Sequence, residues 1–115
     1  MQRIIAAFCN SRDGLLHAAR TEKAVQQEIA LLLAAVPLAV WLGTDNWKRA
    51  VLIGSVLAVI VVELLNTCVE KLSDHVTPEI HPQIKIVKDM GSAAVFFAIV
   101  AAVVVWGAAL WERVG

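Results

Sequence analysis

Long uncharged stretches separated by short polar ones dominate the hydrophobic pattern of this chain. They run from Ile29 to Leu42, from Ala50 to Val62 and from Met90 to Trp111. A membrane-spanning helix needs about 20 residues, and only the third stretch reaches that length alone. The first two become long enough when their polar flanks are included. The pattern therefore predicts an all-α integral membrane protein with three transmembrane helices, over residues 22–43, 47–76 and 83–113.

The first 20 residues have a mixed pattern. Ile4, Ile5 and Phe8 form an apolar face, whereas Arg3 and the Asn10–Gly14 segment are polar. Arginine near the lipid headgroups suits a helix that lies in the membrane surface. We therefore expect an N-terminal amphipathic surface helix over residues 1–20, with residues 10–14 as a candidate interruption. A frayed amphipathic terminus is equally compatible with the pattern.

Turn and capping residues define the expected boundaries of the spans. Thr21 is a suitable cap for a helix that begins at residue 22. Pro37 lies inside the first span and is expected to kink it or to sit against a neighbouring helix. Gly43–Asn46 predicts a turn, and the segment from Thr77 to Pro82 contains two prolines and predicts a loop.

Composition and charge support the membrane assignment. Hydrophobic residues make up 59% of the 115 residues, charged residues only 17%, and the formal net charge is zero. This balance gives no case for nucleic-acid binding. Cys9 and Cys68 have neither metal-ligand spacing nor a disulfide framework.

Lysine and arginine lie mostly before the first span and between the second and third. This bias predicts that the N-terminus and the Glu63–Asp89 region are cytoplasmic.

A polar stripe interrupts the second span. At about 100° per residue, Asn66 lies roughly 60° behind Glu63, and Glu70 and Asp74 lie about 20° to either side of it. A carboxylate joined to a membrane-like segment is costly and suggests a functional site. A solvated helix end just beyond the bilayer explains Asp74 well. It explains Glu63 and Asn66 poorly, because both have apolar neighbours.

These residues also carry a family resemblance. The pattern Glu63-x-x-Asn66-Thr67-x-x-Glu70-x-x-x-Asp74, followed by the segment from Lys88 to Ala94, resembles the prokaryotic diacylglycerol kinase family of small integral-membrane lipid kinases. The similarity runs from Arg3 to Trp111. It implies ATP-dependent phosphorylation of diacylglycerol to phosphatidic acid, with ATP as co-substrate, Mg²⁺ as cofactor and a homotrimeric assembly. Three helices offer too little surface to enclose two substrates, so we expect the site to form between subunits.

The resemblance also implies roles for single residues. Glu22 and Glu70 are the expected Mg²⁺ ligands, since carboxylates are hard oxygen ligands. Glu63 is the expected catalytic base, because it lies at the boundary where the lipid hydroxyl meets the phosphate donor. Glu22 and Glu70 are also expected nucleotide contacts. The other expected nucleotide contacts are Arg3, Asn66, His81, Lys88 and Asp89. The expected lipid contacts are Arg3, Glu63 and Ser92.

Several alternatives stay open at this point. Glu28 is either a helper of the catalytic groups or a polar contact of a tilted helix, and His17 and His75 have no assigned role. In the family an aromatic residue that packs on the nucleotide is common near Asn10, and its absence here leaves the adenine contact open. Some members have lysine at the position of Ala6, so that cation is also missing here. No glycine-rich phosphate loop is present. Undecaprenol kinase activity uses the same chemistry on another lipid, and a non-enzymatic membrane subunit or a transporter would explain Glu63 but not the Lys88-Asp89 pair.

Overall fold

The computed structural model describes residues 1–77 and 81–115, and every regular element within them is an α-helix. This confirms the all-α prediction. The helices are α1 (Gln2–Thr21), α2 (Lys23–Leu42), α3 (Asn46–Val76) and α4 (Pro82–Val114). The predicted loop between the second and third spans includes residues 78–80, which lie outside the described residues.

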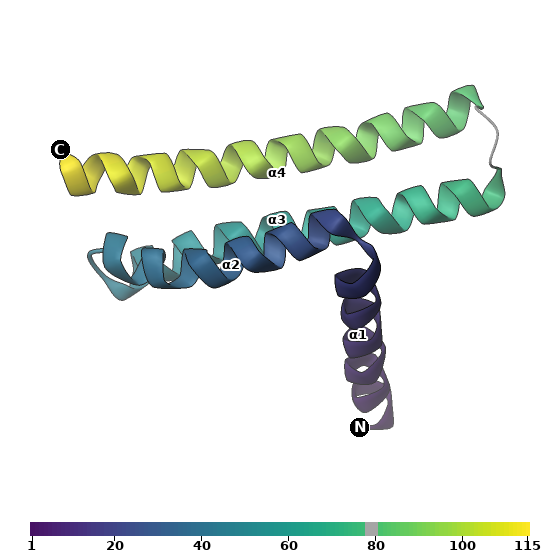
Figure 1. Cartoon of the computed structure of the whole chain (residues 1–115), viewed down its shortest axis with the longest axis horizontal. Helices are drawn as coiled ribbons and strands as arrows, with labels where there is room; N and C mark the ends of the chain where they lie inside the picture. Colours follow the sequence, from purple (N-terminus) through teal and green to yellow (C-terminus); the bar gives the residue numbers. More distant parts are fainter. Residues whose placement is uncertain (78–80) are drawn as a thin grey trace.

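Helices α2, α3 and α4 form an elongated bundle, and α1 projects from it. Helix α3 packs against both α2 and α4, whereas α2 and α4 touch each other little. Figure 1 shows α1 leaving the bundle at the start of α2, so that the N-terminus lies away from the other helices. Helices α3 and α4 continue past this junction and meet at the same end. The residues around that end are those of the predicted polar stripe.

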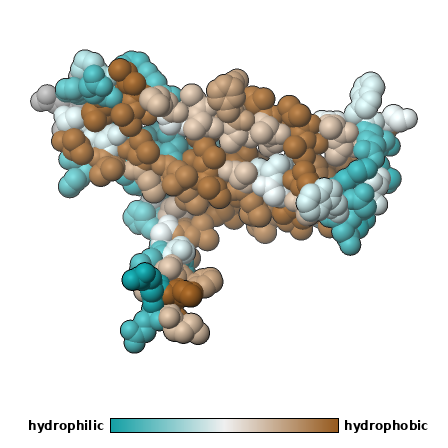
Figure 2. Space-filling view, turned by 180° about the vertical axis from the view of Figure 1, so that it is seen from behind, coloured by the Kyte–Doolittle hydropathy of each residue, from teal (hydrophilic) through white to brown (hydrophobic). Residues whose placement is uncertain are grey.

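Helices α2, α3 and α4 are each long and apolar enough to cross a membrane by length and composition. This confirms the prediction of three candidate spans. Helix α4 has no buried residue. Even its large apolar side chains Phe96, Phe97 and Val103 are each more than 60% exposed. Figure 2 shows hydrophobic surface over the middle of the bundle and hydrophilic residues gathered towards its two ends. A helix that is apolar all round suits a lipid environment or the core of a larger assembly.

The junction between α1 and α2 differs from the prediction. Thr21 does not cap the first span: it is the last residue of α1, and its hydroxyl donates to the His17 carbonyl at 2.8 Å. Glu22 occupies the N-cap position of α2 in an extended conformation, without a side-chain capping hydrogen bond. A threonine hydroxyl can bond back to its own helix, which is why Thr21 ends α1 instead of starting α2. Helix α1 is continuous through Asn10–Gly14, so the candidate interruption is absent.

The turn between α2 and α3 is fixed by polar side chains. Asp45 is the N-cap of α3, and its carboxylate accepts a hydrogen bond from the Lys48 amide at 2.8 Å. The Arg49 guanidinium donates to the Val40 carbonyl near the end of α2 at 3.0 Å. Helix α2 continues through Pro37, whose side chain is exposed. These contacts make α2 and α3 antiparallel neighbours.

The best-packed part of the bundle lies near the α2–α3 turn. Ala39, Leu42 and Leu52 form a buried core against which Trp106 packs. The Trp106 indole donates to the Leu52 carbonyl at 3.2 Å and to the Ser55 hydroxyl at 3.0 Å. Because lipid supplies little hydrophobic driving force between helices, such packing and hydrogen bonds hold α4 to α3.

The same end of the bundle is closed by charged side chains. Lys48 of α3 forms an ion pair with Glu112 of α4. The Arg113 guanidinium of α4 lies 4.9 Å from the centre of the Trp41 ring of α2, a cation–π contact. Together these contacts connect all three helices at this end. The opposite end, where α3 and α4 extend past α2, carries the candidate functional residues.

Candidate functional site

The polar stripe of α3 lies on one continuous helix, as expected, and it is most buried at Asn66. Glu63 is half-buried, Asn66 is only 8% exposed and Glu70 is exposed. The Asn66 amide donates to the Glu70 carboxylate at 3.1 Å. Glu63 and Glu70 are close enough to interact electrostatically. The stripe therefore connects the interior of the bundle with its outer end.

Asn66 packs against the backbone of α4 at Gly91. A β-carbon added at Gly91 would overlap the side-chain oxygen of Asn66. That oxygen is buried, and no described residue donates a hydrogen bond to it. The absence of a side chain at Gly91 lets α3 and α4 approach closely with a polar group between them. The side-chain oxygen of Asn66 therefore lies against the α4 backbone at Gly91.

Glu28 of α2 lies across from Glu63 of α3. The two carboxyl groups interact electrostatically. One oxygen of Glu28 is buried and has no hydrogen-bond partner within residues 1–77 and 81–115. A buried polar atom without a partner is costly. Glu28 is therefore part of the same group of residues as Glu63, whereas the sequence left its role open.

Glu22 joins the group from the start of α2. Its carboxylate forms an ion pair with the Lys71 ammonium at 3.0 Å, and Lys71 follows Glu70 directly in α3. We use the name polar cluster for the residues that α2 and α3 bring together here: Glu22, Glu28, Glu63, Asn66 and Glu70.

The polar cluster offers oxygen donors that suit Mg²⁺. They are the carboxylates of Glu22 and Glu70 and the unpartnered oxygen of Asn66. No group of three or more His, Cys, Asp or Glu residues suited to a metal ion occurs in the described part of the chain. Mg²⁺ usually binds through one or two carboxylates together with substrate phosphates and water. The carboxylates of Glu22 and Glu70 fit such an ion by their chemistry, and in this structure Glu22 is paired with Lys71.

Two ion pairs involve the first turns of α4, and one of them joins α4 to α3. The Lys88 ammonium lies 2.6 Å from the Asp74 carboxylate of α3. Asp89, the next residue, accepts from the Lys85 ammonium one turn earlier at 2.7 Å. Lys88 thus lies beside Asp74 at the outer end of the stripe, and both Lys88 and Asp89 have a partner of opposite charge.

The remaining predicted site residues are less closely connected to the polar cluster. Ser92 follows Gly91 on α4 and is exposed. His81 is the N-cap of α4, where its Nδ1 accepts from the Gln83 amide at 3.2 Å. Arg3 lies in the first turn of α1, at the end that projects from the bundle (Figure 1). The fold of one chain therefore does not bring Arg3 to the polar cluster.

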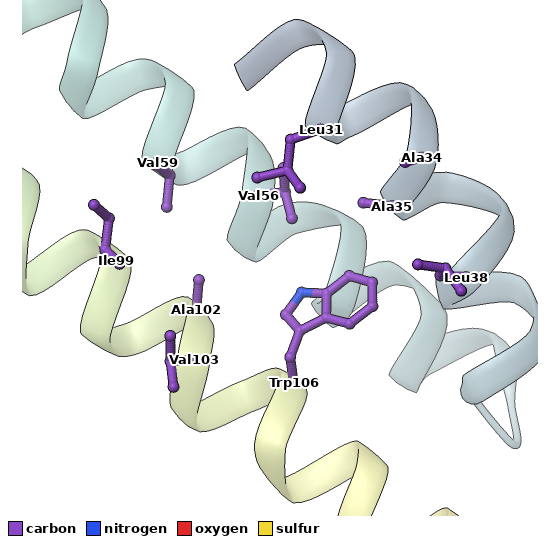
Figure 3. Close-up of a pocket in the computed structure, with 10 residues that line it drawn as sticks. All are labelled: Leu31, Ala34, Ala35, Leu38, Val56, Val59, Ile99, Ala102, Val103 and Trp106. Carbon is purple, nitrogen blue, oxygen red and sulfur yellow. The ribbon is translucent and has the colours of Figure 1, made fainter. Parts of the chain in front are cut away.

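An apolar cavity of about 310 Å³ lies along the same helix faces, deeper in the bundle. Figure 3 shows that α2, α3 and α4 all contribute to its wall. Val59 lies one turn before Glu63 on α3, and Leu31 lies about one turn after Glu28 on α2. The polar atom of Trp106, which also lines the cavity, is already hydrogen-bonded to α3. The cavity therefore suits a hydrocarbon group close to the two carboxylates.

Some of these relationships could have been found from the sequence. Gly91 directly follows Met90 in the third span. Glycine within a membrane helix often marks a close approach of helices. That signal could have suggested a polar residue opposite it. The pairing of Asp74 with Lys88, in contrast, depends on how α3 and α4 meet, and no spacing rule along one helix predicts it.

Comparison with known proteins identifies the family to which this chain is similar. The family model described as prokaryotic diacylglycerol kinase matches residues 9–110. A diacylglycerol kinase of Escherichia coli strain K12 is 43% identical over 113 residues, which cover 98% of this chain and 93% of that protein. A diacylglycerol kinase of Pseudomonas aeruginosa is 39% identical over 96% of this chain and 89% of the relative. One from Haemophilus influenzae is 38% identical over 88% of this chain and 86% of the relative.

Proposed function

This chain belongs to the prokaryotic diacylglycerol kinase family, and from that membership and the geometry of the polar cluster we propose that it transfers the γ-phosphate of ATP to diacylglycerol. The products are phosphatidic acid and ADP. It is a lipid kinase, so the non-enzymatic alternatives are set aside. The observation that carries the proposal is the position of Glu63. It is a half-buried carboxylate between an apolar cavity and a row of polar groups that leads outward.

Glu63 acts as the general base. The lipid hydroxyl oxygen attacks the γ-phosphorus, its proton moves to the Glu63 carboxylate, and the bond from the γ-phosphorus to the bridging oxygen of ADP breaks. Its depth suits this role, because Glu63 lies between the apolar cavity lined by Val59 and the polar groups of Asn66 and Glu70.

The phosphate groups of ATP meet the outer part of the stripe. Lys88 supplies a positive point charge, and Asn66, one turn before Glu70 on α3, is proposed to orient a phosphate group or a metal-bound water. Glu22 and Glu70 are the residues that would hold Mg²⁺, which neutralises phosphate oxygens when it is bound. Asp89 and His81 lie at the start of α4 and are proposed as nucleotide contacts.

The hydrocarbon part of the lipid occupies the apolar cavity below Glu63. Entry of the lipid through the membrane brings its hydroxyl group to the depth of Glu63, while its acyl chain lies against Leu31, Val59 and Trp106. Ser92 and Arg3 are proposed lipid contacts. Lipid preference then depends on the shape of this cavity, so polyprenols such as undecaprenol are the competing substrates that a test must include.

The complete site forms between subunits of a homotrimer in the bacterial inner membrane, with the N-terminus and the polar cluster at the cytoplasmic face. Two features support an assembly. Helix α4 buries no residue within one chain, and Arg3 is remote from the polar cluster of its own chain. The cytoplasmic orientation agrees with the bias of lysine and arginine and with the supply of ATP.

The test is a phosphotransfer assay on the purified chain in mixed micelles, with ATP labelled in the γ-phosphate. The lipid panel contains diacylglycerol, monoacylglycerol, undecaprenol and a long-chain alcohol. We expect label in phosphatidic acid and slower transfer to the other lipids. Label in undecaprenyl phosphate with none in phosphatidic acid would replace diacylglycerol as the substrate, and no label in any lipid would contradict the proposed function.

A further inference from the structure

Asp74 is the member of the α3 stripe that the proposed reaction does not use. It lies one turn beyond Glu70, and its carboxylate forms a 2.6 Å ion pair with Lys88 of α4. Lys88 is also the residue proposed to bind phosphate. We propose that Asp74 competes with the nucleotide phosphates for Lys88 and thereby keeps the affinity for ATP and ADP low. The inference rests on the proposed function, because it assumes that Lys88 binds phosphate.

The position of Asp74 gives the ion pair little value for stability. Asp74 lies in the last turn of α3, which ends at Val76, and a negative charge near a helix C-terminus is unfavourable because of the helix dipole. Its side chain is 61% exposed and that of Lys88 is 38% exposed. Exposed ion pairs of this kind contribute little to stability. A structural clamp is therefore a poor explanation for an acidic residue at this point.

A carboxylate that shares Lys88 with a phosphate weakens the binding of that phosphate. An ammonium group has three donors and can contact two acceptors at once. The two acceptors would then be separated by only about 5 Å, and like charges at such a distance repel each other. Removal of the Asp74 charge takes away both the competing partner and the repulsion.

The neighbouring pair follows the same arrangement. Asp89 is neutralised by Lys85 at 2.7 Å, so the two charges proposed to meet the nucleotide are both already paired within the chain. Weak nucleotide binding has a use in this reaction, because ADP must leave before the next ATP enters. Asp74 would speed this exchange, because its ion pair with Lys88 forms again as ADP departs.

The experiment compares the wild-type chain with Asp74→Asn, which keeps the shape and removes the charge. With diacylglycerol saturating, we expect Asp74→Asn to lower KM for ATP and the inhibition constant for ADP by about two- to fivefold, the range that a partly exposed ion pair can supply. Asp74→Glu retains the charge and should keep the wild-type values. Asp13→Asn on α1 is the matched control, because Asp13 is also exposed and paired with an adjacent cation.

Three outcomes decide the inference. Lower nucleotide constants in Asp74→Asn with a melting temperature close to that of the wild type support it. Unchanged or higher constants overturn it, and a lower melting temperature with unchanged constants identifies Asp74 as a structural residue. Equilibrium binding of ADP to both proteins provides a second readout that does not need turnover. If the wild type transfers no phosphate to lipid, the proposed function fails, whereas the ADP measurement still tests whether Asp74 opposes nucleotide binding.

Discussion

The side-chain oxygen of Asn66 fills the space that a β-carbon at Gly91 would need. This contact fixes how closely α3 and α4 approach beside the proposed active site. It also connects two parts of the sequence that carry the family resemblance, the α3 stripe and the segment that begins at Lys88. The missing side chain at Gly91 thus determines where the buried amide of Asn66 can lie.

The first prediction follows from this contact. Gly91→Ala should force Asn66 or α4 to move, and overpacking of this kind typically costs about 1–3 kcal/mol. We expect a lower melting temperature and a loss of phosphotransfer, because the displaced amide no longer faces the proposed phosphate region. Gly107→Ala is the control on the same helix, since no atom lies within 4 Å of a β-carbon added there.

Alanine at position 107 should be neutral or slightly stabilising, because alanine is a better helix former than glycine by about 1 kcal/mol. Melting curves and lipid kinase assays on both variants provide the comparison. Equal behaviour of the two variants would show that the close approach at Gly91 has no role in stability or catalysis.

Much of the fold was predictable because the hydrophobic pattern is strong. The uncharged stretch from Met90 to Trp111 and the continuous helix through Glu63 follow from composition and from the lack of helix breakers. The end of α1 was predicted wrongly at Thr21, since a hydroxyl can bond within its own helix or cap the next one. Local sequence does not distinguish these two possibilities.

The candidate site was predictable along one helix but not between helices. The periodicity of α3 predicted that Glu63, Asn66 and Glu70 share a face, and the Asn66–Glu70 hydrogen bond agrees with this prediction. Contacts between Asn66 and Gly91, or between Asp74 and Lys88, depend on the relative position of α3 and α4. That position results from packing over the whole length of both helices.

The second prediction concerns the opposite end of the bundle. Trp106→Phe removes two hydrogen bonds to α3, from the indole to Leu52 and to Ser55, and replaces the indole with a smaller aromatic ring. We expect a loss of stability of about 1 kcal/mol, typical of a hydrogen bond within a membrane bundle or a soluble protein. Trp111→Phe is the control, because Trp111 is 79% exposed. An equal decrease in melting temperature for both variants would contradict a specific role of Trp106.

The third prediction tests the proposed metal ligands. Glu70→Gln and Glu22→Gln should each raise the Mg²⁺ concentration needed for half-maximal activity, because an amide oxygen is a weaker ligand than a carboxylate for a hard cation. Titration of activity with Mg²⁺ at fixed ATP measures the shift. Asp13→Asn on α1 should keep the wild-type curve. A wild-type curve for Glu70→Gln would reject its assignment as a ligand.

The fourth prediction tests whether subunits share a site. The variants Glu63→Gln and Lys88→Ala should each be inactive alone. Refolding of the two together should restore part of the activity if the two residues serve one site from different chains of the proposed trimer. Verified mixed oligomers without any recovered activity would favour a site in which both residues come from the same chain.

The last prediction separates catalysis from structure at Glu63. Glu63→Gln keeps the shape of the side chain and removes its ability to accept a proton. A general base typically contributes about 10²–10⁴ to the rate, so kcat should fall within that range while KM for ATP changes little. The melting temperature should stay unchanged or rise, because the variant removes the cost of keeping a charge at a partly buried position. A structural Glu63 would give the reverse, with lower stability and preserved activity per folded protein. Steady-state kinetics and a melting curve on the same preparation decide between these results, and a kcat within a few-fold of the wild type would exclude Glu63 as the base.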